Sequence, residues 1–390
     1  MKKILKMFLY IFHYILILLL SSMKKSGVVK QADSPVTNIL LIQLNAIGDL
    51  LMTSPAINSI FKRYPSAKID ICVLTKNLKT VYLLQHKFDY VYHTNTQSFF
   101  SILKSYIKYF FIFKKYDIII DFTGSIYSAY LTKLASLFSK TTYTTGFSKS
   151  LLLTRKSVLP RFHSLYTHST EPNINLSLIN GNYIMHNLNT LTLDVGAQPN
   201  SDYTITLPEQ AIKSMKLKLL QINKDNKPLI LVHPGTKWQP KLWPATYWVE
   251  LLNQLISLDK FNLILATGEF EKKLRPKLLK EVPGIIDLRT DIFELAACVY
   301  LSCLVISLDS VTMHLAYALR KKYIALFGPV SPKQSGYPDY VNGKHLYSNL
   351  YCSPCELYYK RDECERGRNY CMIAIKPEMI VDAIKNTLNF

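Results

Sequence analysis

The feature that most constrains the fold is an alternation of apolar runs and helical patterns that becomes regular at Asn38. Ile39–Leu44 is an apolar run typical of a buried parallel strand, and Leu50–Arg63 has apolar residues at helical spacing. Between them, Asn45–Asp49 is expected to form a loop. The rhythm continues and predicts a doubly wound α/β sheet. The other elements expected in this half are strands at 69–74 and 117–122 and helices at 98–115 and 126–138.

A second α/β segment follows in the other half of the chain. The rhythm weakens between Gly146 and Asp202, where residues 174–193 indicate a long helix, and it restarts at Leu229. Two domains of this kind, joined near residues 195–225, predict a cleft between them. The expected strands are 229–232, 262–266, 304–307 and 323–327, and the expected helices are 245–256, 293–301, 312–319 and 377–389, the last with a proline just inside its start.

Composition narrows the class of protein. A chain of 390 residues is long enough for two such domains, and 49% apolar with 19% charged residues excludes a disordered chain. Lys and Arg number 47 against 27 Asp and Glu, and the resulting charge of +20 must face nucleic acid, an anionic membrane surface or an anionic substrate. We find no compact RNA-binding motif. Seven cysteines are too few for a disulfide-stapled secreted scaffold.

The first 30 residues differ from the rest of the chain. The apolar run Met7–Leu20 follows Lys2, Lys3 and Lys6, three more lysines come after it, and no acidic residue precedes Asp33. The run is shorter than the roughly 20 residues of a membrane span, and a poor signal-peptide cleavage site follows it. Three interpretations remain open: an uncleaved signal anchor, an interfacial helix and a buried terminal helix. The lysines and the aromatic residues favour membrane contact, with a linker at residues 26–36.

Four of the cysteines lie near the C-terminus with the spacing C-x2-C-x8-C-x6-C. A C-x2-C pair can present two thiolates to one zinc ion, and two further cysteines would complete a tetrahedral structural site. The second half lacks a tight pair, so reduced thiols or a disulfide pair remain as alternatives. The four residues are Cys352, Cys355, Cys364 and Cys371, whereas Cys72, Cys298 and Cys303 lie in apolar patterns typical of a core.

One loop in the first half and three in the second join a strand end to a helix start, where open α/β sheets bind ligands. In the first loop, Gly48 permits a tight turn and Asp49 lies near the helix N-terminus. Asp49 either faces a ligand or serves only as the helix N-cap. A dinucleotide fingerprint would need G-x-G-x-x-G here, and the single glycine argues against a dehydrogenase.

The second loop reads His-Pro-Gly-Thr-Lys-Trp at residues 233–238. Gly235 and Thr236 could offer N–H groups and a hydroxyl to a phosphate, and Lys237 and Lys241 could offer cations. The alternative is an exposed basic loop above a packed tryptophan.

The third loop, residues 307–314, places Asp309 and Ser310 at a helix entrance, where N–H groups bind anions. Alternatively, Asp309 only caps the helix and His314 is a satisfied interior histidine. The fourth loop, residues 327–332, is a strand end followed by a rigid Gly/Pro turn. Four such loops at one cleft would suit a nucleotide-linked donor on one side and an acceptor on the other.

These motifs, in this order and spacing, resemble the ADP-heptose:lipopolysaccharide heptosyltransferases. That family has the GT-B architecture, in which two Rossmann-like domains face a cleft. The resemblance covers about residues 38–385. Its landmarks are IGDLLMTSPA at 47–56, HPG at 233–235, KLWP at 241–244, TGEFE at 267–271, the segment 309–314, LFGP at 326–329 and CSPC at 352–355.

The resemblance implies an inverting, metal-independent transfer of a heptose or related sugar from an ADP-sugar to the lipopolysaccharide core or a similar glycolipid. It implies that Asp49 is the general base in an acceptor domain at residues 37–200, and that residues 201–375 form the donor domain. No cofactor is required, apart from the zinc considered above. The implied donor contacts are Thr236 and Lys241 to the diphosphate, Glu271 to the ribose, Asp309 to the sugar and Ser310 to phosphate, with Gln43, Lys237 and His314 as further acceptor or phosphate contacts.

Two residues depart from the family's pattern. Gln43 stands where the family usually has Arg or Lys, and Val311 stands where it usually has Gly after Asp-Ser or Asp-Thr. Valine does not readily adopt a positive φ. These departures keep open a degenerate family member that binds without transferring.

The organisation expected from the sequence also includes a membrane-associating segment with its linker at 1–36 and a C-terminal helix at 376–390. Because the donor is made in the cytosol and the acceptor is a lipid, the chain is expected on anionic lipid at the cytoplasmic face of the bacterial inner membrane, without a nucleic-acid partner. A non-enzymatic basic membrane or nucleic-acid binding protein would explain the charge, but not the loops of the second domain.

Overall fold

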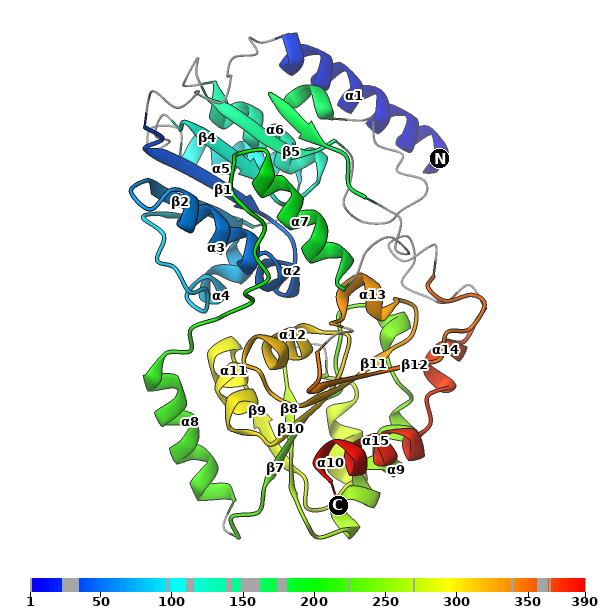
Figure 1. Cartoon of the computed structure of the whole chain (residues 1–390). Coiled ribbons are helices and arrows are strands. Elements are labelled where there is room, and N and C mark those ends of the chain that lie inside the picture. Colours follow the sequence, from blue (N-terminus) through cyan, green and yellow to red (C-terminus); the bar gives the residue numbers. More distant parts are fainter. Residues whose placement is uncertain are drawn as a thin grey trace. The chain divides into compact units, whose positions relative to one another are not determined.

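The structure is a computed structural model of the chain. It describes all residues except 1, 23–34, 96–97, 110–115, 138–141, 149–161, 174–180, 224, 269–270, 338–339, 356–363, 365 and 390. The chain forms two compact units, drawn in Figure 1. Unit 1 comprises residues 1–175 and 184–202, and unit 2 comprises residues 176–183 and 203–390.

Unit 1 is built on a six-stranded sheet with the order β3-β2-β1-β4-β5-β6, in which neighbouring strands are parallel. The order reverses between β1 and β4, and this switch point is where doubly wound sheets bind ligands. The strands are β1 (Asn38–Gln43), β2 (Lys68–Leu74), β3 (Val91–Thr94), β4 (Ile118–Asp121), β5 (Tyr143–Phe147) and β6 (His168–Thr170).

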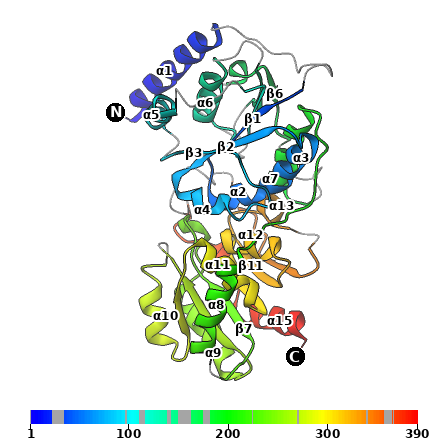
Figure 2. The ribbon, with the colours of Figure 1, turned by 90° about the vertical axis from the view of Figure 1, so that its left-hand side faces the viewer.

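The helices of unit 1 cover the sheet because its central strand is apolar on both faces. Leu40 and Ile42 of β1 pack in one cluster with Ile102 and Leu131, which lie on α5 and α6. Helices α3 and α7 lie on the other face (Figure 2). The helical segments are α1 (Lys2–Ser22), α2 (Ile47–Met52), α3 (Ser54–Arg63), η1 (Thr75–Asn77), α4 (Leu78–Val81), α5 (Phe99–Tyr109), α6 (Ile126–Ser136), η2 (His163–Leu165) and α7 (Tyr183–Leu193).

Unit 2 repeats this arrangement with a second parallel sheet in the order β12-β11-β10-β7-β8-β9. Its order reverses between β7 and β10, so this unit also has a switch point. The strands are β7 (Leu229–His233), β8 (Asn262–Thr267), β9 (Ile286–Arg289), β10 (Leu304–Leu308), β11 (Tyr323–Phe327) and β12 (Gly343–Tyr347).

The main core of unit 2 lies between the sheet and helices α9 and α15. Trp248 and Leu252 of α9 and Ile380 and Ile384 of α15 are fully buried in it. Each such side chain contributes about 1.5–3 kcal/mol by leaving water. The helical segments are α8 (Glu209–Ile222), η3 (Gln239–Lys241), α9 (Ala245–Ser257), α10 (Arg275–Glu281), α11 (Ile292–Leu301), α12 (Val311–Ala318), α13 (Pro332–Ser335), α14 (Tyr370–Ile373) and α15 (Pro377–Leu388).

Most expected elements are present, with corrections at particular residues. The single helix expected at 50–63 is wrong, because the chain breaks at Thr53 between α2 and α3. Pro55 lies in the first turn of α3 and cannot donate the backbone hydrogen bond that a continuous helix needs. The helix expected at 174–193 is described only for its second part, α7, and most of the linker expected at 26–36 lies outside the described residues.

The N-terminal apolar run is helical, as expected, and forms α1. Within the part of the chain that the structure describes, no helix has the length and apolar character needed to cross a bilayer.

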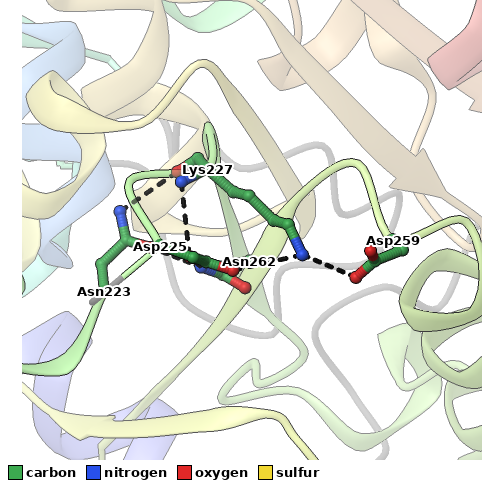
Figure 3. A network of polar contacts seen from close by, with 5 residues as sticks. All are labelled: Asn223, Asp225, Lys227, Asp259 and Asn262. Carbon is green, nitrogen blue, oxygen red and sulfur yellow. Dashed lines mark hydrogen bonds and ion pairs between the residues drawn. The ribbon is translucent and has the colours of Figure 1, made fainter.

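A polar network closes the edge of the unit 2 sheet at which β7 and β8 begin (Figure 3). Lys227 donates to Asp259 at 2.6 Å and lies 3.1 Å from Asp225, and the Asn262 side chain donates to both Asn223 and Asp225. The network connects the turn before β7 to the start of β8. It lies at the sheet edge opposite to the one where the strands end, so we assign it to stability.

Candidate functional site

The first candidate site lies where β1 ends, at the switch point of unit 1. Helix α2 begins at Ile47, so Gly48 and Asp49 belong to its first turn and the loop expected at 45–49 is shorter than predicted. Ala46 is the N-cap residue, and its backbone N–H donates to the Asp49 carboxylate at 3.0 Å. Asp49 is therefore not the N-cap, but it stabilises the helix start and remains partly exposed.

Gln43 lies inside the domain at the end of β1, where it is fully buried. Its amide donates to the Thr53 hydroxyl at 2.7 Å, and its Oε1 accepts from the Asn45 N–H at 3.3 Å. The Thr53 hydroxyl donates to the Asp49 carbonyl at 2.7 Å. Gln43, expected as an acceptor or phosphate contact, thus connects the end of β1 to the loop before α2 and to Thr53, the C-cap residue of α2.

The end of β4 contributes a second set of contacts, which the sequence analysis missed. The Thr123 hydroxyl accepts a hydrogen bond from the Leu44 N–H at 2.9 Å, and the Thr123 backbone carbonyl accepts one from the Asn45 side-chain amide at 3.1 Å. The buried Asp121 accepts from the Thr123 N–H at 2.9 Å and from the Tyr166 hydroxyl at 2.7 Å. Burial raises the pKa of Asp121 to about 6. No sequence motif marks these residues; only the pairing of β1 with β4 brings them to the site.

In unit 2, the chain after β7 passes closely over Glu271. A Cβ at Gly235 would lie 1.3 Å from Glu271 Oε1, so any other residue there would force the Glu271 side chain to move. Glu271 is 1% exposed, and its Oε2 accepts from the Gly268 N–H at 2.6 Å. Oε1 lies 3.5 Å from His233 Nε2 but has no hydrogen-bond partner among the described residues. Burial, opposed by the Glu271 charge, lowers the pKa of His233, so this imidazole is neutral at pH 7.

A buried ion pair lies beside this loop. Lys241 of η3 holds Asp309, which follows β10, with 2.7 Å between Nζ and Oδ2. The Ser335 hydroxyl donates to Oδ1 of the same carboxylate at 3.1 Å. The Lys241 and Asp309 side chains are 12% and 4% exposed. Burial favours the neutral acid, but Lys241 outweighs it and holds the pKa of Asp309 below its ordinary value, so the pair is charged.

Helix α12 begins directly after this pair. Its N-cap residue is Ser310, whose hydroxyl makes no capping hydrogen bond. The Asp309 carboxylate contacts Lys241 and Ser335, so the alternative in which Asp309 only caps the helix is wrong. Val311 is the first helical residue and does not have a positive φ, so valine fits here without backbone strain.

Buried polar atoms without a partner gather at one edge of the unit 2 sheet. In the described part of the chain, six such side-chain atoms lie at or after the ends of β7, β8 and β10 or at the start of α12. The three strands are neighbours, and parallel strands end at the same edge. Because buried polar groups are normally hydrogen-bonded, this concentration indicates a polar ligand or ordered water. The atoms are His233 Nδ1, Thr267 Oγ1, Glu271 Oε1, Ser307 Oγ, Ser310 Oγ and Thr312 Oγ1.

The other residues expected at this site differ in exposure. His314 is buried and shares a hydrogen bond of 2.7 Å with the Tyr337 hydroxyl. Burial lowers the pKa of His314 to about 4, so it cannot offer a positive charge to phosphate at neutral pH. Its geometry agrees with the interior-histidine alternative. Lys237 is exposed, whereas Thr236 is buried within the loop.

The C-terminal segment around α14, residues 369–375, supports the loops of the site. The Asn369 side chain donates to the Leu242 carbonyl at 2.6 Å, and the Trp243 indole donates to the Ile375 carbonyl at 2.8 Å. A Cβ at Gly328 would lie 2.2 Å from Met372 Sδ, so the turn after β11 also packs directly on this segment.

The four C-terminal cysteines are free thiols, and burial raises the pKa of Cys371 to about 11. Among the described residues, which include all four, no group of three or more His, Cys, Asp or Glu side chains could hold a metal ion. The described geometry therefore does not supply a zinc site, and bound zinc stays a prediction. Of the other cysteines, Cys72 and Cys298 are buried and Cys303 is partly buried.

Comparison with known proteins decides the family. Residues 112–365, more than half of the chain, match glycosyltransferase family 9 (heptosyltransferase). The chain belongs to this family. The family 9 chain is 30% identical over 176 residues to lipooligosaccharide heptosyltransferase 2 of Campylobacter jejuni subsp. jejuni serotype O:2, a match covering 43% of this chain and 53% of that protein. It thus spans about half the length of this relative.

Other matches are longer. The chain is 24% identical over 366 residues to lipopolysaccharide heptosyltransferase 3 of Escherichia coli strain K12, covering 87% of this chain and 95% of that protein. Its fold matches the family 9 glycosyltransferase of Veillonella parvula with a TM-score of 0.71 at 17% identity, covering 91% and 97% of the two chains. It matches E. coli heptosyltransferase WaaC with ADP-2-deoxy-2-fluoro heptose with a TM-score of 0.61 at 16% identity, covering 90% and 99%. The expected GT-B fold is therefore confirmed.

The first prediction concerns the ion pair. Lys241→Ala leaves the buried Asp309 carboxylate without its counterion, which should cost about 3–5 kcal/mol of unfolding free energy at pH 7. Without Lys241, burial raises the pKa of Asp309, so the acid protonates and the difference from wild type narrows as pH falls from 7 toward 4. Denaturant unfolding across this pH range measures the effect.

Two controls accompany this measurement. Lys237→Ala removes an exposed lysine of the same loop and should change stability little. The double variant Lys241→Met, Asp309→Asn removes both charges and should recover much of the loss. A pH-independent difference between Lys241→Ala and wild type would contradict a charged pair.

The second prediction concerns Cys352, Cys355, Cys364 and Cys371, whose spacing predicts zinc. Elemental analysis of full-length protein purified without chelator should find either about one zinc per chain or, if the alternative holds, no zinc and four close reduced thiols. Thiol titration before and after chelation is the companion measurement. A zinc content near zero, with all four thiols reacting freely, would reject the metal interpretation.

Proposed function

We propose that this chain is an inverting glycosyltransferase that moves a heptose, or a related sugar, from an ADP-sugar to the lipopolysaccharide core or a similar glycolipid. The observation that best supports the proposal is the unit 2 sheet edge, where Lys241, Asp309 and Glu271 lie among unsatisfied buried polar atoms. The names of two relatives, both heptosyltransferases of lipopolysaccharide or lipooligosaccharide, support the substrate class. A similar fold with an ADP-linked heptose analogue supports the donor.

In this proposal, unit 2 binds the donor nucleotide. Glu271 Oε1 accepts a hydrogen bond from a ribose hydroxyl, which would satisfy its lone pairs. The diphosphate is held by the Thr236 hydroxyl, the Lys241 ammonium and the N-terminal N–H groups of α12 beside Ser310, where positive charge and the helix dipole favour an anion. Asp309, fixed by Lys241 and Ser335, contacts the donor sugar.

The proposed reaction is a displacement at the anomeric carbon. The acceptor hydroxyl oxygen attacks from the face opposite ADP, the bond to the diphosphate oxygen breaks with its electron pair, and the configuration inverts. Asp49 takes the proton of the acceptor hydroxyl as the new bond forms. Lys241 and the start of α12 stabilise the charge that develops on the diphosphate, which would let ADP leave without a bound metal ion.

Asp49 suits the role of base for two physical reasons. Its hydrogen bond from the Ala46 N–H fixes the orientation of the carboxylate. Its partial exposure would let an acceptor hydroxyl approach.

The proposed location is the cytoplasmic face of the bacterial inner membrane. The ADP-sugar is a cytosolic metabolite and the acceptor is attached to lipid, so the two substrates meet at that surface. The charge of +20 would favour association with anionic headgroups there.

The third prediction tests the base. Asp49→Asn keeps an oxygen that can accept from the Ala46 N–H, but it cannot take a proton. Transfer of radiolabelled heptose from ADP-heptose to a deacylated core acceptor should slow by about 10²-fold or more. ADP affinity and Tm should stay close to wild type. Asp49→Ala is the companion variant, and it should lose both turnover and some stability because the helix-start contact disappears as well.

Two results would revise the proposal in different ways. Near wild-type turnover in Asp49→Asn would leave Asp49 with only its structural role. ADP binding without any transfer by wild type would indicate the alternative function, a degenerate family member that binds an anionic glycolipid or membrane without catalysis.

A further inference from the structure

Helix α1 docks on unit 1 through one face. His13, Ile17 and Leu20 follow one another at spacings of four and three residues and are 1%, 5% and 9% exposed. Ile17 and Leu20 pack in a cluster with Tyr130 of α6 and Leu165 of η2. His13 Nδ1 shares a hydrogen bond of 2.8 Å with the Tyr130 hydroxyl. Burial lowers the pKa of His13, so this inner face of α1 is uncharged at neutral pH.

The opposite face of α1 is apolar and exposed. Six large apolar side chains between residues 11 and 19, which we call the outer face of α1, are each 44–61% exposed. In both overall views, α1 lies at the margin of unit 1 (Figures 1 and 2). Soluble monomers rarely expose so many adjacent apolar side chains unless the surface binds a partner. The six residues are Ile11, Phe12, Tyr14, Ile15, Leu18 and Leu19.

The charges in the sequence around α1 indicate the chemistry of that partner. Three lysines precede the apolar run, three follow it, and no acidic residue occurs before Asp33. A surface that combines apolar side chains with flanking lysines matches a bilayer, where acyl chains accept the former and anionic headgroups attract the latter. A second copy of this chain would bring the same charge of +20 and would be repelled.

We propose that the outer face of α1 inserts into the headgroup region of an anionic bilayer while the inner face stays docked on unit 1. The helix then lies in the membrane plane and is part of the folded domain. Surrounding α1 with lipid would require His13, Ile17 and Leu20 to leave their partners in unit 1. The outer face of α1 is thus the surface that would hold the chain at the proposed membrane location. The inference rests on the proposed function only for the identity of the acceptor.

Vesicle binding by the full-length chain tests the outer face. The double variant Leu18→Gln, Leu19→Gln changes side chains that are 53% and 61% exposed, so folding should be retained. Its partitioning onto phosphatidylcholine vesicles that contain phosphatidylglycerol should fall by about tenfold or more, because two leucines no longer leave water. The matched control is Leu217→Gln, Leu220→Gln on α8, where the leucines are 64% and 54% exposed and binding should not change.

A disulfide lock tests whether α1 stays docked. The Ser21 hydroxyl donates to the Ser164 hydroxyl at 2.8 Å, so Ser21→Cys, Ser164→Cys can join α1 to unit 1. The oxidised protein should bind vesicles as well as wild type does. Loss of binding on locking, with recovery after reduction, would overturn the docked arrangement.

The remaining outcomes separate this inference from the proposed function. Equal vesicle binding by the Leu18/Leu19 variant and wild type would overturn the outer face as the membrane contact. So would a change of oligomeric state in that variant without a change in vesicle binding, because the partner would then be a second copy. Transfer to a soluble deacylated acceptor should survive in the variant, and its absence in wild type would count against the proposed reaction alone.

Discussion

Parallel pairing obliges the six strands of each sheet to end at one edge, and both candidate sites depend on this constraint. In unit 1 it brings the turn after β1, with Asp49, against Thr123 after β4. In unit 2 it brings the turn after β7 beside Asp309, which follows β10. Both pairs of strands flank the point at which the strand order reverses. The two units therefore use the same geometry for different chemistry: a carboxylate at a helix start in one, and a cation with a second helix start in the other.

Burying the Lys241–Asp309 pair costs desolvation free energy, so stability alone is a weak reason for keeping this ion pair. Its position suggests a different reason. The pair fixes an ammonium group beside the N-terminus of α12, so two sources of positive potential lie together before any ligand arrives. Preorganised charge of this kind stabilises a departing diphosphate without reorganisation during the reaction. The C-terminal segment contributes through Asn369, which holds the chain immediately after Lys241.

Strands β1 and β11 could be predicted from the sequence because they are buried and read as apolar runs. The edge strands β3 and β12 could not be predicted so easily, since their residues alternate in burial and include His93 and His345. The break at Thr53 was not predicted, because apolar residues keep helical spacing on both sides of Pro55.

The loops of the sites could also be predicted, because they join strand ends to helix starts. The contacts within the sites could not be predicted, because partners such as Lys241 and Asp309 lie 68 residues apart in the chain and no spacing rule connects them. Asp121 was missed for the same reason: only the pairing of β4 with β1 places it beside Ile42, at the end of β1.

If the unsatisfied polar edge of unit 2 is a nucleoside diphosphate site in which Glu271 contacts the ribose, ADP should bind there. Calorimetric titration of the full-length chain with ADP tests this most directly. Two glycine variants are compared with wild type, and only one of them would displace the Glu271 side chain. An alanine Cβ at 235 would lie 1.3 Å from Glu271 Oε1, whereas one at 268 would make an ordinary 3.5 Å contact with Oε2. Wild type and Gly268→Ala should bind ADP alike, whereas Gly235→Ala should bind ADP about tenfold or more weakly, the change in affinity expected when one well-placed hydrogen bond is lost. No binding by wild type, or equal affinity in all three proteins, would contradict this assignment.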